Sequence, residues 1–180
     1  MSVRIVEGET RLINLRTRMP FKYGIATMTD VPYAFLRLAV EIDGTIHEGY
    51  SADNLPPKWF TKIPEDPLGG EMAEMLRVIE HARETAIGLQ ADTPFDLWLD
   101  LYETQAAWGD SENLAPLLSG FGTSMVERAL IEAACRAANK PFAAAVRDQH
   151  LGIALAAIQI QLNTTKPHEW LPKQPLQSII

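Results

Sequence analysis

The chain has 180 residues, of which 47% are hydrophobic and 22% are charged, and its formal net charge is −7. This length suffices for one domain, or for one domain and a piece of another. The acidic balance argues against nucleic acid or an anionic membrane surface as a partner, and no apolar run reaches the roughly 20 residues of a membrane span. The single cysteine, Cys135, excludes an internal disulfide and favours a reducing, cytoplasmic setting.

The first part of the chain predicts an antiparallel sheet of three strands that follow one another. Residues 3–18 look extended, with Gly8 as a point where the run can bulge or bend, and a loop is expected over residues 20–32. Residues 33–43 show the clearest alternation of apolar and polar side chains. The apolar face of this strand consists of Leu36, Leu38, Val40 and Ile42.

The turn after this strand leaves two registers open. A two-residue turn would pair Val40 with His47, whereas a three-residue loop ending on Gly44 would pair Val40 with Ile46. We favour the second register, because it keeps apolar residues opposite one another and gives glycine the left-handed position that such a loop needs. This register would place Glu48 on the apolar face of the sheet.

A proline-rich stretch over residues 53–70 is expected to be a loop, with Lys58, Trp59 and Phe60 near its centre. Two interpretations of these aromatic residues stay open. They fold back on the sheet as ordinary packing, or they face a ligand, because exposed loops on rigid scaffolds often carry recognition.

Two helices are expected after this loop. The first covers about residues 70–90, with an apolar stripe toward the core, Glu71 on its wet face and His81 in solvent. The second begins at Thr93-Pro94, because proline suits the first helical position and threonine suits the cap. Its apolar side is predicted to consist of Phe95, Trp98, Leu99, Tyr102 and Ala106.

Residues 120–147 predict a helix, a stop and a second short helix. Ser124 and Glu127 have the spacing of a capping box, so the helix is expected to begin there. Its apolar stripe is narrow and mostly alanine, which would let another backbone pack close against it. Cys135 lies in this stripe and is interpreted as a small buried hydrophobe, and Pro141 prevents simple continuation of the helix.

The last segment, residues 148–180, is expected to be irregular with a short helix. It ends on Ile179-Ile180, two apolar residues that look like the first half of a buried strand. The sequence contains no G-x-S-x-G, no glycine-rich phosphate loop and no H-E-x-x-H motif. Its four histidines form no metal-binding spacing with Cys135.

The order of three motifs carries a resemblance to a known family. These motifs are RMPFKYGIAT at 18–27, the hairpin with EIDG at 41–44 and EGYS at 48–51, and SMVERALIEAACRAANKPF at 124–142. Together they resemble the N-terminal capping domain of the enolase superfamily, in the mandelate racemase/muconate lactonizing enzyme group. The likeness covers about residues 3–147 and implies an α+β fold, with a three-stranded antiparallel meander followed by a helical layer.

The resemblance also implies a function. Such enzymes close a capping domain over a (β/α) barrel that holds magnesium and a base, and they abstract a proton alpha to a carboxylate. Two loops, here residues 20–30 and 50–60, would select the substrate, with a lysine pairing with the substrate carboxylate. The residues that this places near a ligand are Phe21, Lys22, Tyr23, Asp53, Asn54, Lys58 and Trp59.

Three parts of the chain follow from the resemblance: a capping domain (1–119), a helical segment leading into the barrel (120–147), and an irregular insert with the start of the first barrel strand (148–180). A barrel needs roughly 200–250 residues, whereas 33 follow Arg147. We therefore expect the barrel to be missing and to act in cis or as a separate chain. Magnesium is expected in a full-length parent, with no metal ligand or catalytic residue in this chain.

Three hypotheses are compared. The first is a capping domain that is not catalytic alone and serves a lyase or isomerase acting on a small carboxylate. The second is a free-standing α+β binding or oligomerisation module that forms a homo-oligomer through its apolar faces. The third is a complete small enzyme that uses Glu48 with one of the histidines.

Overall fold

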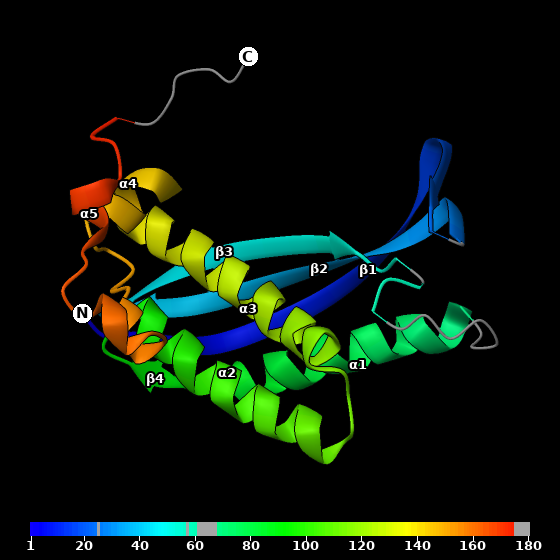
Figure 1. Ribbon diagram of the computed structural model, residues 1–180, viewed down its shortest axis with the longest axis horizontal. Coiled ribbons are helices and arrows are strands. Elements are labelled where there is room, and N and C mark those ends of the chain that lie inside the picture. The colour runs from blue at the N-terminus through cyan, green and yellow to red at the C-terminus, as the bar shows by residue number, and fades with distance from the viewer. Residues whose placement is uncertain (25, 57, 61–67, 175–180) are drawn as a thin grey trace.

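The computed structural model describes residues 1–24, 26–56, 58–60 and 68–174. It confirms the α+β fold, with an antiparallel sheet that carries its helices on one face (Figure 1). The predicted meander is present, and a short fourth strand joins it beside β1, giving the order β3-β2-β1-β4. The strands are β1 (Val3–Tyr23), β2 (Ala26–Ile42), β3 (Thr45–Asn54) and β4 (Gln90–Ala91).

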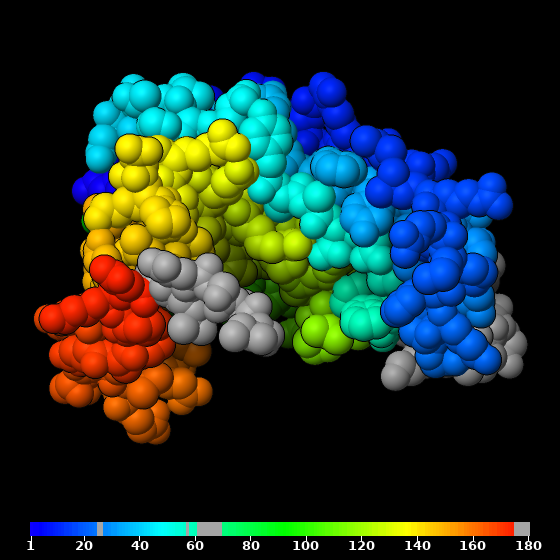
Figure 2. All heavy atoms as spheres, turned by 90° about the horizontal axis from the view of Figure 1, so that it is seen from above, coloured from blue at the N-terminus to red at the C-terminus, as the bar shows by residue number. Residues whose placement is uncertain are grey.

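Three long helices form the layer over the sheet, and α3 packs against α1, α2 and β3. Residues 148–174 contain two 3-10 helices and a short α-helix, and Figure 2 shows this segment at the opposite end of the molecule from the hairpin of β1 and β2. No helix in the described part of the chain is both long and apolar enough to cross a membrane. The helices are α1 (Leu68–Ala86), α2 (Pro94–Ser111), α3 (Pro116–Ala137), α4 (Phe142–Arg147), η1 (Leu155–Ala157), η2 (Ile160–Leu162) and α5 (Pro167–Trp170).

The buried face of β2 is the predicted one, but the favoured hairpin register is wrong. Val40 lies opposite His47, as the two-residue turn requires. Asp43 and Gly44 both have positive φ, 49° and 81°. A two-residue turn with positive φ at both positions has a twist that matches that of the flanking strands. The register places Glu48 on the open face of the sheet, so the expected half-buried carboxylate is absent from the apolar face.

The loop expected over residues 20–32 is also wrong, because β1 and β2 continue as a paired hairpin arm. Tyr23 pairs with Ala26 across a turn in which Gly24 has a φ of +51°. A register shift between Arg16 and Phe21 accommodates Pro20, which has no N–H to offer the ladder. Figure 1 shows the arm rising at the right, away from the layer of helices.

Helix α3 begins eight residues before the predicted capping box. Pro116 occupies its first turn, where a missing N–H costs nothing, and the hydroxyl of Ser124 donates to the carbonyl of Phe121 inside the helix. The predicted domain boundary after residue 119 thus falls within α3. Close approach of a second backbone is confirmed, because a Cβ added to Gly49 of β3 would lie 1.9 Å from the carbonyl oxygen of Ala129.

The first two helices differ from the prediction in which side chains they bury. Glu71 is only 4% exposed, and His81 stacks on Trp108 with ring centroids 3.7 Å apart, so neither is a solvated residue. In α2 the cap by Thr93 is confirmed. The predicted aromatic side of α2 is only partly buried, and the fully buried stripe consists of Leu97, Leu101 and Gln105.

Cys135 is partly buried and packs against the core, as a small apolar side chain does. Burial raises the pKa of its thiol, and so does the charge of Glu132. Both effects keep the thiol protonated and weakly reactive. The expected strand start at Ile179-Ile180 lies outside the described residues.

Candidate functional site

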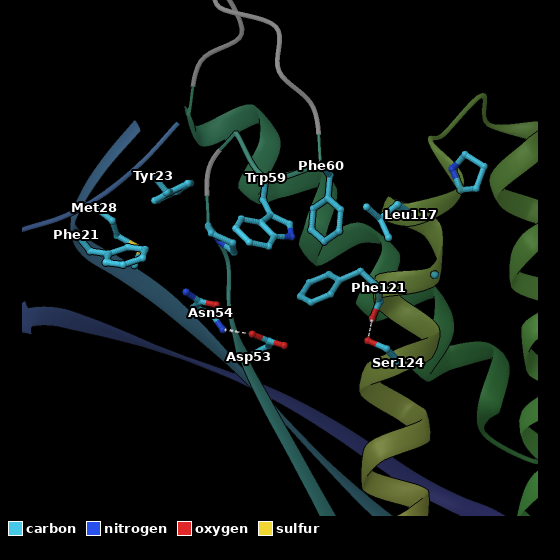
Figure 3. Close-up of a pocket in the computed structure, with 13 residues that line it drawn as sticks. Phe21, Tyr23, Met28, Asp53, Asn54, Trp59, Phe60, Leu117, Phe121 and Ser124 are labelled. Atoms are coloured by element: carbon cyan, nitrogen blue, oxygen red, sulfur yellow. Dashed lines mark hydrogen bonds between the residues drawn. The ribbon is translucent and has the colours of Figure 1, made fainter. Parts of the chain in front are cut away.

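A pocket of about 600 Å³ opens where four segments meet. These segments are the tip of the hairpin arm, the end of β3, the loop that follows it and the first turns of α3 (Figure 3). The described residues that line it are Phe21, Tyr23, Met28, Asp53, Asn54, Pro56, Trp59, Phe60, Pro116, Leu117, Gly120, Phe121 and Ser124.

Aromatic rings form two sides of this pocket. On one side Tyr23 lies between Phe21 and Trp59, with ring centroids 5.8 Å and 6.1 Å away. On the other side Phe60 packs against Phe121 at 5.1 Å, as Figure 3 shows. Phe21 and Trp59 are each 56% exposed, so rings that would ordinarily be buried face open space in the pocket.

The structure brings together five of the seven predicted site residues, namely Phe21, Tyr23, Asp53, Asn54 and Trp59. The two lysines do not line the pocket. Lys22 lies between Phe21 and Tyr23 in β1, and successive side chains of a strand point to opposite sides. Lys58 turns toward α1, where its side chain is only 7% exposed. The sequence led us to expect a lysine that meets a substrate carboxylate, but neither Lys22 nor Lys58 is placed to do so in this pocket.

A buried carboxylate lies beneath the loop that carries Trp59. Glu71 accepts a hydrogen bond from the backbone N–H of Lys58, and its Oε1 lies 3.8 Å from the Nζ of the same residue. Burial raises the pKa of the Tyr23 phenol, and the charge of Glu71 raises it further. The negative charge of Glu71 therefore acts on the Tyr23 hydroxyl at the hairpin tip as well as on the loop, and it favours the protonated form of the phenol.

Polar groups at the base of the pocket have partners within the protein. The carboxylate of Asp53 accepts from the backbone N–H of Asn54 at 2.9 Å and pairs with Arg128 at 3.1 Å. The Ser124 hydroxyl donates to the carbonyl oxygen of Phe121 at 2.8 Å. Both the Asp53 carboxylate and the Ser124 hydroxyl are therefore already engaged within the protein.

The pocket does not fit a magnesium site. No cluster of three or more histidine, cysteine, aspartate or glutamate side chains suitable for a metal ion occurs among the described residues. Asp53 is the acidic residue in the described lining, and its charge is matched by Arg128. Magnesium prefers several oxygen ligands around it, and the described lining of this pocket offers one carboxylate that is already paired.

Glu48 belongs to a cluster on the open face of the sheet. Arg37 donates to Glu48 at 2.9 Å and also pairs with Glu7 and Glu9. Hydrogen bonds from Tyr50 and Arg37 lower the pKa of Glu48, which makes this carboxylate a weak base. The hypothesis of a small enzyme built on Glu48 gains no support from this arrangement.

Sequence reasoning missed part of the pocket wall. Phe121 lies between Gly120 and Gly122, a glycine pattern too short to predict a phosphate loop, and Leu117 precedes the expected start of the helix. Phe60 was identified, but its ligand-facing and packing roles could not be separated. In the structure Phe60 is partly buried against the core and also lines the pocket.

Comparisons with known proteins place the fold. No protein-family model matches the chain, and no curated protein sequence does either. A solved enolase from alpha proteobacterium BAL199 with bound Mg aligns with a TM-score of 0.56 and 16% identity, over 92% of this chain and 44% of its own. L-talarate dehydratase from Polaromonas sp. JS666, complexed with Mg and L-glucarate, aligns with a TM-score of 0.55 and 15% identity. The alignment covers 80% of this chain and 35% of the dehydratase.

A mandelate racemase/muconate lactonizing enzyme-like protein from Rubrobacter xylanophilus gives a TM-score of 0.53 at 19% identity, over 80% of this chain and 33% of its own. The chain thus spans between a third and just under a half of the solved proteins it resembles. At such identities the likeness concerns the fold. The chain therefore shares its α+β fold with part of these solved enolase and mandelate racemase/muconate lactonizing enzyme-like proteins.

Proposed function

We propose that this chain is the capping domain of an enolase-superfamily lyase or isomerase, which acts on a small carboxylate by abstracting its alpha proton. The observation that carries the proposal is the meeting of two distant segments, around Tyr23 and around Trp59, at one aromatic pocket. These are the segments that the family resemblance assigns to substrate selection. The likeness in fold to a solved enolase, over 92% of this chain, supports the family part of the proposal.

In this proposal the chain supplies binding and not proton transfer. Its rings cover one end of the substrate and exclude water from it, while the loop around Trp59 is held in place by Glu71 beneath it. The base and the magnesium belong to a (β/α) barrel, joined to this chain or supplied separately. The chain alone is then inactive, because binding without a base does not lower the barrier to proton abstraction.

The test begins with the coding sequence after the codon for Ile180 and in the neighbouring reading frames. A barrel found there is produced with and without this chain, and exchange of the substrate's alpha proton is followed by NMR in D₂O with Mg²⁺. We expect exchange only when both parts are present. Exchange by the purified 180-residue chain alone, or by the barrel alone at the full rate, would contradict the proposal.

A second candidate function is a free-standing binding or oligomerisation module. It is favoured by large apolar side chains on the open sheet face and on the arm, including Ile13, Leu15 and Phe35. Such exposure is typical of interaction surfaces. Sedimentation of the purified chain distinguishes the two: a stable homo-oligomer that needs no barrel favours the module, whereas a monomer that associates with the barrel favours the cap.

A further inference from the structure

The lining of the pocket determines which part of a substrate it accepts. We infer that the pocket takes an apolar group, preferably an aromatic ring, at the end of the substrate remote from the reacting carboxylate, and that it rejects polyhydroxylated acids. This inference rests on the proposed function and narrows the substrate class within it.

The shape of the pocket favours a flat ring. Tyr23 and Trp59 meet edge to face, with 62° between their planes, while Phe60 and Phe121 are tilted by 44° on the opposite side. Ring pairs at such separations leave apolar faces and edges for a further ring to pack against. A pocket of about 600 Å³ is large enough for a phenyl or indole group together with its linker.

The polar groups argue against a sugar acid. Each hydroxyl of a polyhydroxylated chain needs a hydrogen-bond partner once water is excluded, whereas the Asp53 carboxylate and the Ser124 hydroxyl are already engaged. None of the described lining residues is a lysine, arginine or histidine. The nearest cation to the Asp53 carboxylate is Arg128, which is already paired with it at 3.1 Å. A second carboxylate at the remote end of a diacid would therefore have to compete with Asp53 for that guanidinium.

The experiment measures binding to the purified 180-residue chain by two-dimensional ¹H–¹⁵N NMR titration. The probes are 4-phenylbutyrate, 4-phenylbutanol and L-glucarate. In this inference the pocket contacts the ring and not the carboxylate. The two phenyl compounds are therefore expected to bind with dissociation constants within about threefold of each other, and glucarate is expected to bind at least about tenfold more weakly. Tighter binding of glucarate, or a phenyl alcohol that binds at least tenfold more weakly than the phenyl acid, would overturn the inference.

Two tryptophans of equal exposure give a matched pair of variants. Trp59 is 56% exposed in the pocket and Trp170 is 57% exposed on α5, so neither substitution removes a core side chain. Trp59→Leu is expected to weaken the binding of 4-phenylbutyrate at least about fivefold, since an aromatic ring is lost from the pocket. Trp170→Leu is expected to leave this binding unchanged. Equal effects of the two substitutions would overturn the assignment to this pocket.

Failure of the inference differs from failure of the proposed function. If barrel and chain together exchange the alpha proton of glucarate but not of phenyl-substituted acids, the capping function holds and the apolar class is wrong. If the phenyl compounds bind at Trp59 but no acid of either class exchanges its proton with the barrel present, the ring-binding pocket holds and the capping function is wrong.

Discussion

Two glycines permit the closest approaches of helix α3 to its neighbours. Gly49 of β3 lies against the backbone of Ala129, and Gly122 of α3 lies against α1, where an added Cβ would be 2.0 Å from the carbonyl oxygen of Val78. Backbone atoms cannot move aside as the end of a flexible side chain can. A methyl group at either glycine would therefore force the two elements apart.

Gly122→Ala and Gly120→Ala form a matched pair two residues apart in α3. Gly122→Ala is expected to lower the free energy of unfolding by about 2 kcal/mol or more, through the clash with Val78. Gly120→Ala meets nothing within 4 Å, and it should raise the free energy by up to about 1 kcal/mol, because alanine favours the helix. Urea denaturation measures both, and similar values for the two would contradict the packing described.

Glu71 is the buried charge on which the loop around Trp59 depends. Its carboxylate and the Lys58 ammonium are both nearly inaccessible to water. Glu71→Gln removes a counter-charge 3.8 Å from the buried Lys58 ammonium, so we expect a loss of about 3 kcal/mol in the free energy of unfolding. Glu74→Gln on the same helix serves as the control and should cost less than about 1 kcal/mol.

The measurement is urea denaturation at pH 7, with 4-phenylbutyrate binding as a second readout. The Glu71 variant should bind more weakly at urea concentrations where it is still folded, because Trp59 is no longer held in place. Unaltered stability and binding in the Glu71 variant would show that this pair does not hold the loop.

At the scale of secondary-structure elements, strand β3 is an edge strand whose outer backbone groups are covered by side chains. Glu132 of α3 accepts from the N–H of Tyr50, and Arg128 donates to the carbonyl of Ala52 at 3.2 Å. Exposed strand edges are templates for pairing with another chain. These two side chains therefore close the edge with bonds that a neighbouring strand would otherwise make.

Removing both side chains should open this edge. The double variant Arg128→Ala/Glu132→Ala keeps the net charge and is expected to self-associate as its concentration rises, which light scattering measures. The control is Arg77→Ala/Glu112→Ala, which removes an exposed ion pair of 2.9 Å between α1 and the end of α2 and should leave the chain's association unchanged. Association of both variants to the same degree would point to a general loss of stability.

Considered as a whole, the molecule has a packed body and a projecting arm. The body contains the core of α1, α2, α3 and the inner sheet face. Along residues 12–19 the arm exposes apolar side chains of both strand faces, with Leu12 51% and Met19 66% exposed. Its ladder is also interrupted by the register shift after Arg16.

Hydrogen exchange should separate the arm from the body. We expect amide hydrogens of residues 12–19 to exchange at least about a hundredfold faster than those of residues 36–40, because local opening of the arm exposes no core. Mass spectrometry of the isolated chain measures this. Equal protection of the two segments would mean that the arm is covered in solution, as the oligomerisation module requires.

The buried face of β2 and the cap of α2 followed from the sequence, because alternation and capping are local properties. The hairpin register was predicted wrongly, because we gave the pairing of apolar residues across the strands more weight than the two-residue turn that Asp43-Gly44 prefers. The burial of Glu71 and the outward position of Lys22 were missed as well. Both depend on where a distant segment of the chain packs, and the periodicity of a helix or strand carries no information about distant segments.

The sequence by itself determined the α+β order of strands and helices and, through motif order, the likeness to a capping domain. It also identified five residues of the aromatic pocket. Only the tertiary structure decided that these five residues meet Phe60 and Phe121 in one cavity, and that the Lys58 side chain lies beside Glu71 and not in the pocket. The physical reason is that periodicity and turn chemistry act over a few residues, whereas the pocket is built from contacts between segments up to a hundred residues apart.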